Sequence, residues 1–256
     1  MRNILILGAG RSGTSMVAGT LAKAGYFMGE QLIKARETNP KGFFEDIEVN
    51  SINEDILARV VPRRPQFIPR KIRKYFFRKR PARGQRWLAK VPLNTKIPLT
   101  SDSKHRIEKL TSNISYCFKD PRFSYTLPNW RPFLDNTFFV CVFREPSITV
   151  ESILKECRRA KYLHSLAINR EDIFDVWTLM YSHILETHCF TGKWLFLHFD
   201  QVVTGNGLER LAGFAGANVD TDFPDIKLKR SKQYFENRSD SWQCYVKLCE
   251  LADYKI

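Results

Sequence analysis

The chain has 256 residues, of which 43% are hydrophobic and 13% aromatic, enough to bury a full core in one α/β domain with insertions. No run approaches the roughly eighteen consecutive apolar residues of a membrane-spanning helix, and an apolar stretch begins at Ile4, so we expect neither a membrane span nor a signal peptide. The six cysteines contain no CxxC pair, which indicates reduced thiols and a cytoplasmic protein.

The positive charge of the chain is concentrated in one region. The formal net charge is +14, and residues 56–101 hold fourteen Lys or Arg and no Asp or Glu. Of the 41 basic residues, 27 therefore remain elsewhere, against 27 acidic ones. This excess predicts a surface that meets nucleic acid, acidic lipid or an acidic polymer, and a solvated basic face is the alternative.

Apolar runs alternate with amphipathic stretches along the chain, which is typical of βαβ units around a mainly parallel sheet. The predicted strands cover residues 4–7, 138–143 and 194–197. The predicted helices cover residues 12–23, 45–59, a segment that begins at Pro146, 172–187 and 207–214. Between them, residues 62–86 are rich in proline and basic side chains, and we interpret them as an insertion in a single domain of residues 1–256.

The loop after the first strand, residues 8–15, combines glycines with the predicted start of a helix, so backbone N–H groups converge where a phosphate would bind. Its glycines fit both G-x-G-x-x-G and the P-loop spacing. Thr14 stands where the P-loop lysine would be, which argues against ATP hydrolysis. Glu30 lies where a dinucleotide-binding protein would have its ribose-binding carboxylate, although the segment before it has little strand character. On the loop alone, phosphosulfate and dinucleotide binding both remain open.

Four short blocks stand out in chain order. They are Gly10-Arg11-Ser12-Gly13-Thr14-Ser15, Asn39-Pro40-Lys41-Gly42-Phe43-Phe44-Glu45-Asp46, Lys119-Asp120-Pro121-Arg122, and Arg144-Glu145-Pro146 with Ser152. Together they resemble the sulfotransferase superfamily, specifically the bacterial-type branch often found with glycan-building enzymes. The resemblance covers about residues 4–215. It implies a P-loop-like, three-layer α/β fold with a central, mainly parallel sheet flanked by helices.

The resemblance also implies a reaction and a co-substrate. The chain would transfer a sulfuryl group from 3′-phosphoadenosine 5′-phosphosulfate to a hydroxyl, or to an amine, of an acceptor, with a carbohydrate, free or lipid-linked, as the leading class. The donor's 5′-phosphosulfate would bind the loop of Gly10, Arg11, Ser12, Gly13, Thr14 and Ser15, through the Arg11 side chain, backbone N–H groups and the hydroxyls of Thr14 and Ser15. Its 3′-phosphate would bind Arg144 and Ser152. Arg230, in the basic run 227–232, would close over the nucleotide, as late basic segments do in some relatives.

Three residues are predicted to act in the chemistry. Arg11 would stabilise the departing phosphate, and Lys119 would contact the transferring group, as similar lysines do in related enzymes. Glu45 is the first candidate for the general base, followed by Asp46 and Glu30. Neither the histidines nor the carboxylates have a metal-ligand spacing, so we expect no metal.

Two other functions compete with sulfuryl transfer. The glycine loop favours an oxidoreductase that binds NAD or FAD, and the basic region favours a nucleic-acid-binding protein, although no nucleic-acid motif accompanies it. Nucleic acid is therefore the less favoured partner. If residues 70–80 are helical, Ile72, Tyr75 and Phe76 share one face, and cations occupy the others. This pattern predicts peripheral contact with a polyanion or with an anionic membrane surface, which for a cytoplasmic protein is the inner membrane face.

Overall fold

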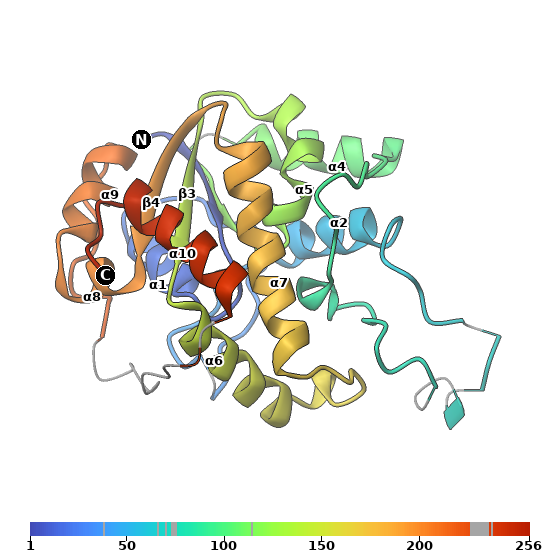
Figure 1. Ribbon diagram of the computed structural model, residues 1–256. Helices are drawn as coiled ribbons and strands as arrows, with labels where there is room; N and C mark the ends of the chain where they lie inside the picture. Colours follow the sequence, from blue (N-terminus) through green and yellow to red (C-terminus); the bar gives the residue numbers. More distant parts are fainter. Residues whose placement is uncertain are drawn as a thin grey trace.

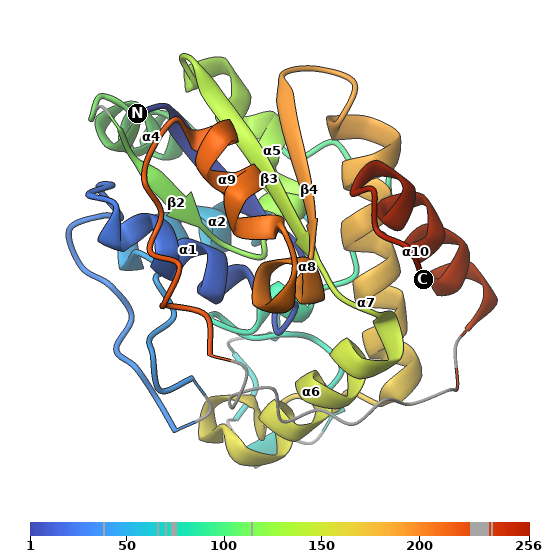
Figure 2. The same ribbon diagram turned by 90° about the vertical axis from the view of Figure 1, so that its left-hand side faces the viewer.

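The computed structural model of the protein describes residues 1–37, 39–65, 67–69, 71–72, 76–113, 115–225, 236 and 238–256. Four parallel strands in this part of the chain form one sheet in the order β2-β1-β3-β4. They are β1 (Asn3–Leu7), β2 (Cys117–Lys119), β3 (Thr137–Phe143) and β4 (Lys193–His198). Figure 2 shows the strands side by side, with β3 running through the middle of the domain. The predicted parallel sheet is confirmed.

Helices cover both faces of the sheet (Figures 1 and 2). One face packs on α1 (Thr14–Lys23) and α9 (Gly207–Ala215), with α8 (Phe199–Thr204) beside them. The other packs on α2 (Ile47–Leu57), α4 (Ser101–Thr111), α5 (Phe123–Trp130), α7 (Arg170–His183) and α10 (Ser239–Leu251). Further helical elements are α6 (Pro146–Arg159), the single turns η1 (Arg86–Leu88), η2 (Arg131–Phe133) and η3 (Lys161–Leu163), and the π-helical η4 (Ile184–His188).

Alternation along the strands explains the three layers. In β1, Ile4 and Ile6 face α1 and α9, whereas Leu5 and Leu7 face the larger core, because successive strand residues point to opposite faces. All seven residues of β3 are buried, as expected for a strand covered on both sides. The predicted three-layer α/β fold class is therefore confirmed.

The basic insertion is attached to the domain near its two ends. Arg64 donates hydrogen bonds to Ser165 and Gln85, and the backbone N–H of Ala167 donates to the carbonyl of Arg78, at 2.7 Å. Between these anchors the side chains of Phe67 and Phe76 are 88% and 72% exposed. Figure 1 shows this part of the chain extending away from the sheet. The helical face predicted for residues 70–80 lies partly outside the described residues, because residues 70 and 73–75 are not among them.

No helix in the described part of the chain combines the length and the hydropathy that crossing a bilayer requires. All six cysteines are free thiols. Four of them are buried, as the sequence predicts for core thiols.

Candidate active site

A cavity of about 670 Å³ opens at the carboxyl ends of the strands. Its walls come from the loops after β1, β2 and β3, from the chain before α2, and from α6 and η3. Ligands of open α/β sheets bind at this edge. Residues of all four sequence blocks line this cavity, and the fourth block contributes Arg144 and Ser152.

The loop after β1 is built for a close approach of backbone to ligand. Gly8 and Gly13 have φ angles of +130° and +98°, and Arg11 also adopts a left-handed conformation, at +71°. A Cβ at Gly8 would collide with the carbonyl of Val142 on β3. Helix α1 begins at Thr14, so the N–H groups of its first turn face the cavity. This part of the site has the geometry expected of an anion-binding loop.

The predicted loop residues divide into two groups. Gly10, Arg11, Gly13, Thr14 and Ser15 line the cavity. The Ser12 side chain is fully buried and accepts a hydrogen bond from the hydroxyl of Tyr181, at 3.1 Å. The Ser12 side chain therefore packs beneath the loop, its backbone N–H donates to the carbonyl of Ala9 at 3.3 Å, and Ser12 does not line the cavity as predicted.

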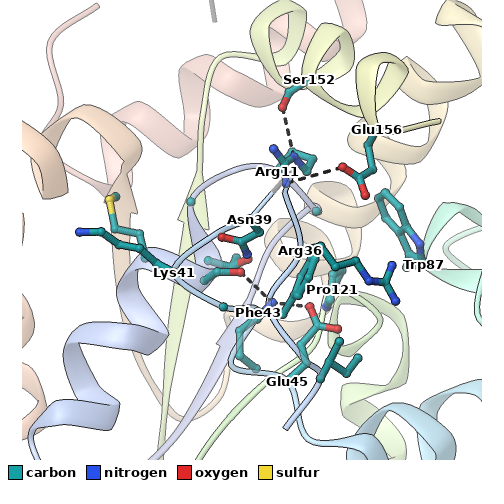
Figure 3. Close-up of a pocket in the computed structure, with 18 of the residues that line it drawn as sticks. Arg11, Arg36, Asn39, Lys41, Phe43, Glu45, Trp87, Pro121, Ser152 and Glu156 are labelled. Carbon is teal, nitrogen blue, oxygen red and sulfur yellow. Dashed lines mark hydrogen bonds and ion pairs between the residues drawn. The ribbon is translucent and has the colours of Figure 1, made fainter. Parts of the chain in front are cut away.

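Arg11 reaches across the cavity to α6 (Figure 3). Its Nε donates to Ser152 Oγ at 3.2 Å, and its guanidinium lies 4.0 Å from Glu156 Oε2. Ser152 and Glu156 are one helical turn apart and share a face of α6. Arg11 therefore links the loop after β1 to Ser152, the residue predicted to bind the 3′-phosphate.

Lys119 and Glu45 form a buried ion pair beside the loop. The Lys119 side chain is 2% exposed and also donates to Ser15 Oγ, at 3.2 Å. Asn50 Nδ2 on α2 donates to the other oxygen of Glu45, at 3.2 Å. Two predicted catalytic side chains and one predicted loop residue therefore meet at one point of the cavity wall.

Asp46 and Glu30, the second and third candidates for the base, lie differently. Asp46 is the N-cap of α2, where its carboxylate accepts from the backbone N–H groups of Gln31, Glu48 and Val49. Glu30 is exposed and does not line the cavity. Among the three carboxylates, Glu45 is the one that faces the loop.

Arg144 follows β3 and is 6% exposed. Its guanidinium carbon lies 4.1 Å from the centroid of the Phe199 ring, and its Nη2 is buried without a hydrogen-bond partner among the described residues. Burial lowers the pKa of Arg144, Asp200 and Glu145 act in the opposite direction, and neighbouring Arg11 lowers the pKa further. An arginine keeps its charge nonetheless, so this side chain is a buried cation that an anionic ligand would stabilise.

A second buried network holds α2 against the end of β2. Arg122 donates from Nε to Glu54 at 2.9 Å and from a terminal nitrogen to Asp120 at 3.0 Å, and Arg86 donates to Glu54 at 2.6 Å. Arg122 also donates to Asn50 Oδ1, at 3.0 Å. Because Asn50 contacts Glu45, this network fixes the position of the candidate base. Removing one member of such a buried charge network usually costs about 3–5 kcal/mol.

Several cavity residues had no assigned role in the sequence. They are Arg36, Trp87, Lys155, Glu156, Arg159 and Tyr162. Glu156 could have been predicted, because it lies four residues after Ser152 and residues at that spacing share one face of a helix. Arg230, the remaining predicted site residue, lies outside the described residues. The described residues contain no group of three or more His, Cys, Asp or Glu placed for a metal ion.

No protein-family model and no curated protein matches the chain. Three solved structures are similar in fold. The sulfotransferase domain of the curacin biosynthetic pathway has a TM-score of 0.55 and 13% identity over 100% of this chain and 99% of its own. Sulfotransferase STF9 from Mycobacterium avium has a TM-score of 0.53 and 12% identity, over 100% and 78% of the two chains. The sulfotransferase domain of the Synechococcus PCC 7002 olefin synthase has a TM-score of 0.50 and 14% identity, over 99% and 95%.

These likenesses show that the chain has the sulfotransferase fold. The resemblance of the four sequence blocks to that superfamily is confirmed at the level of the fold.

Proposed function

We propose that this protein transfers a sulfuryl group from 3′-phosphoadenosine 5′-phosphosulfate to a hydroxyl of an acceptor. The observation that carries the proposal is the buried Arg144, whose Nη2 has no partner among the described residues, in the same cavity as the anion-binding loop. One cavity therefore offers two separate anion sites. The donor has two anionic groups, whereas NAD and ATP lack the 3′-phosphate.

Each side chain has a role in this mechanism. The loop and Arg11 bind the 5′-phosphosulfate, and Arg144 with Ser152 binds the 3′-phosphate. As the acceptor oxygen attacks sulfur, the bond from sulfur to the phosphate oxygen breaks and 3′-phosphoadenosine 5′-phosphate leaves. Glu45 takes the hydroxyl proton, and Lys119 moves from Glu45 toward the sulfuryl oxygens, where negative charge is stabilised. A carbohydrate is the acceptor class that the four sequence blocks favour.

The donor site can be tested by thermal unfolding with different ligands. At a hundred times its dissociation constant, 3′-phosphoadenosine 5′-phosphate should add about 2.7 kcal/mol to the free energy of unfolding. NAD and FAD at equal concentration should add little, because they lack a group for Arg144. Stabilisation by NAD or FAD alone would instead support a dinucleotide-dependent oxidoreductase and contradict the proposal.

We also propose that the basic insertion contacts an anionic membrane surface or a polyanion. Phe67 and Phe76 are exposed together with Lys71, Arg78 and Lys79. Each cation near an acidic bilayer contributes about 1 kcal/mol. Replacing the three cations by glutamine should therefore weaken cosedimentation with phosphatidylglycerol vesicles by about 10²-fold at low salt.

A matched control replaces three exposed lysines elsewhere, Lys104, Lys109 and Lys247, by glutamine. This variant should bind the vesicles as the unaltered protein does. If the unaltered protein ignores acidic vesicles at low salt, the insertion makes no membrane contact.

A further inference from the structure

The cavity carries far more positive than negative charge. Among the described residues its walls contain nine Lys or Arg and three carboxylates, Glu45, Glu156 and Asp225. Each carboxylate lies within 4.0 Å of a cavity cation, namely Lys119, Arg11 and Lys41, respectively. The acidic side chains of the cavity are thus already balanced, and six of the nine basic ones have no partner among them.

The proposed donor accounts for only part of this excess. Arg11, Lys119 and Arg144 face its two anionic groups. Arg122 pairs with Glu54 and Asp120, and Arg83 pairs with Asp55, outside the cavity. Three cations remain, Arg36, Lys155 and Arg159, and none of them has a carboxylate within 4.0 Å in the part of the chain that the structure describes.

These three cations border the same end of the cavity. Lys155 and Arg159 are one helical turn apart on α6, beyond Ser152. The guanidinium carbon of Arg36 lies 5.1 Å from the centroid of the Tyr162 ring, in η3 directly after α6, and 5.6 Å from that of Phe43. In Figure 3 the Arg36 side chain extends toward Trp87 and away from Lys41. Contact with these two rings holds Arg36 between η3 and the chain segment that carries Glu45.

The basic insertion reaches this cavity as well. Arg83 and Gly84, near its carboxyl end, line the wall. The basic region of residues 56–101 therefore borders the cavity through Arg83. Clefts lined by charge of one sign raise the local concentration of ligands of the opposite sign.

We propose that the acceptor carries an anionic group, a phosphate, sulfate or carboxylate, near its reacting hydroxyl, and that Arg36, Lys155 and Arg159 bind that group. The inference rests on the proposed function, because it assigns the donor to Arg11, Lys119 and Arg144. Arginine binds phosphate and carboxylate through two parallel hydrogen bonds, so Arg36 and Arg159 are suited to orient the acceptor as well as to attract it.

The test measures binding of two related sugars to the protein saturated with 3′-phosphoadenosine 5′-phosphate. N-acetylglucosamine 6-phosphate should bind at least about 10-fold more tightly than N-acetylglucosamine at low salt, as expected for one charge-assisted contact. The double variant Arg36→Gln with Arg159→Gln should lose this advantage. Its affinities for the neutral sugar and for the nucleotide should not change.

The control exchanges neighbouring cations that do not line the cavity, Lys34→Gln with Arg158→Gln. It should keep the preference for the phosphorylated sugar. Equal binding of both sugars to the unaltered protein would overturn the inference, and so would an equal loss in the control variant. A weaker nucleotide affinity in the Arg36 and Arg159 variant would assign these cations to the donor instead.

If the nucleotide does not bind at all, the proposed function is wrong, and this result is distinct from a failure of the inference about the acceptor. The two sugars are then compared on the free protein, and equal affinities there overturn the inference as well.

Discussion

Replacing Arg144 by alanine is expected to weaken binding of 3′-phosphoadenosine 5′-phosphate by about 10- to 10²-fold, because a charge-assisted contact is worth about 1.5–3 kcal/mol. The loss should be much smaller for adenosine 5′-phosphosulfate, which lacks the 3′-phosphate. Arg144 lines the cavity, and its Nη2 makes no hydrogen bond to the described residues. Titration calorimetry with both nucleotides measures the difference.

Arg131→Ala is the matched control. Its guanidinium also lies over an aromatic ring, 5.1 Å from the centroid of Phe139, but outside the cavity. This variant should bind both nucleotides normally. Equal losses for both nucleotides in Arg144→Ala would remove the 3′-phosphate assignment.

Ser152→Ala needs a separate interpretation. Because Ser152 Oγ accepts from Arg11 Nε, this substitution also releases Arg11, which faces the phosphosulfate in our proposal. We therefore expect Ser152→Ala to weaken both nucleotides, and Arg144→Ala to weaken mainly the 3′-phosphorylated one.

The sequence predicted the framework of the site because its strands are continuous apolar runs. β1, β3 and β4 are such runs, and each leads directly into a polar segment that lies at the carboxyl edge of the sheet. The first helix begins at Thr14, two residues later than predicted, because Gly13 adopts a left-handed conformation that ends the loop.

Other elements had too little local signal. β2 has only three residues, and it is recognisable as a strand because it pairs with β1. In α4 only Ser103, Ile107 and Leu110 are buried, so the apolar stripe on which a helix prediction depends is thin. Neither element could be predicted without its tertiary partner.

The roles of cavity residues depend on contacts between distant segments. Nothing near Arg36 in the sequence indicates that its guanidinium meets Tyr162, more than a hundred residues later. Glu45 and Asp46 are adjacent carboxylates of the same block, and the sequence alone ranks them without separating them. The structure separates them because Asp46 caps α2 and thereby directs Glu45 toward Lys119.

The different positions of these two carboxylates support the assignment of Glu45 as general base. Asn50 and Lys119 each hold one of its carboxylate oxygens, so the side chain is oriented before the acceptor arrives. In the mechanism that we propose, Lys119 moves to the sulfuryl oxygens, and one oxygen of Glu45 then becomes free to accept the hydroxyl proton. Lys119 would thus link donor binding to the activation of the base.

Glu45→Gln should therefore lower turnover by about 10²-fold or more and leave binding of 3′-phosphoadenosine 5′-phosphate nearly unchanged. Glutamine keeps the shape of the side chain but cannot take up a proton at neutral pH. Turnover is followed as nucleotide release with the sugar that the unaltered enzyme sulfates fastest. Glu48→Gln, in the first turn of α2, paired with Arg106 and not lining the cavity, should be fully active. Normal turnover in Glu45→Gln would show that Glu45 is not the general base. A loss of nucleotide affinity equal to the loss of turnover would instead show that Glu45 only positions Lys119.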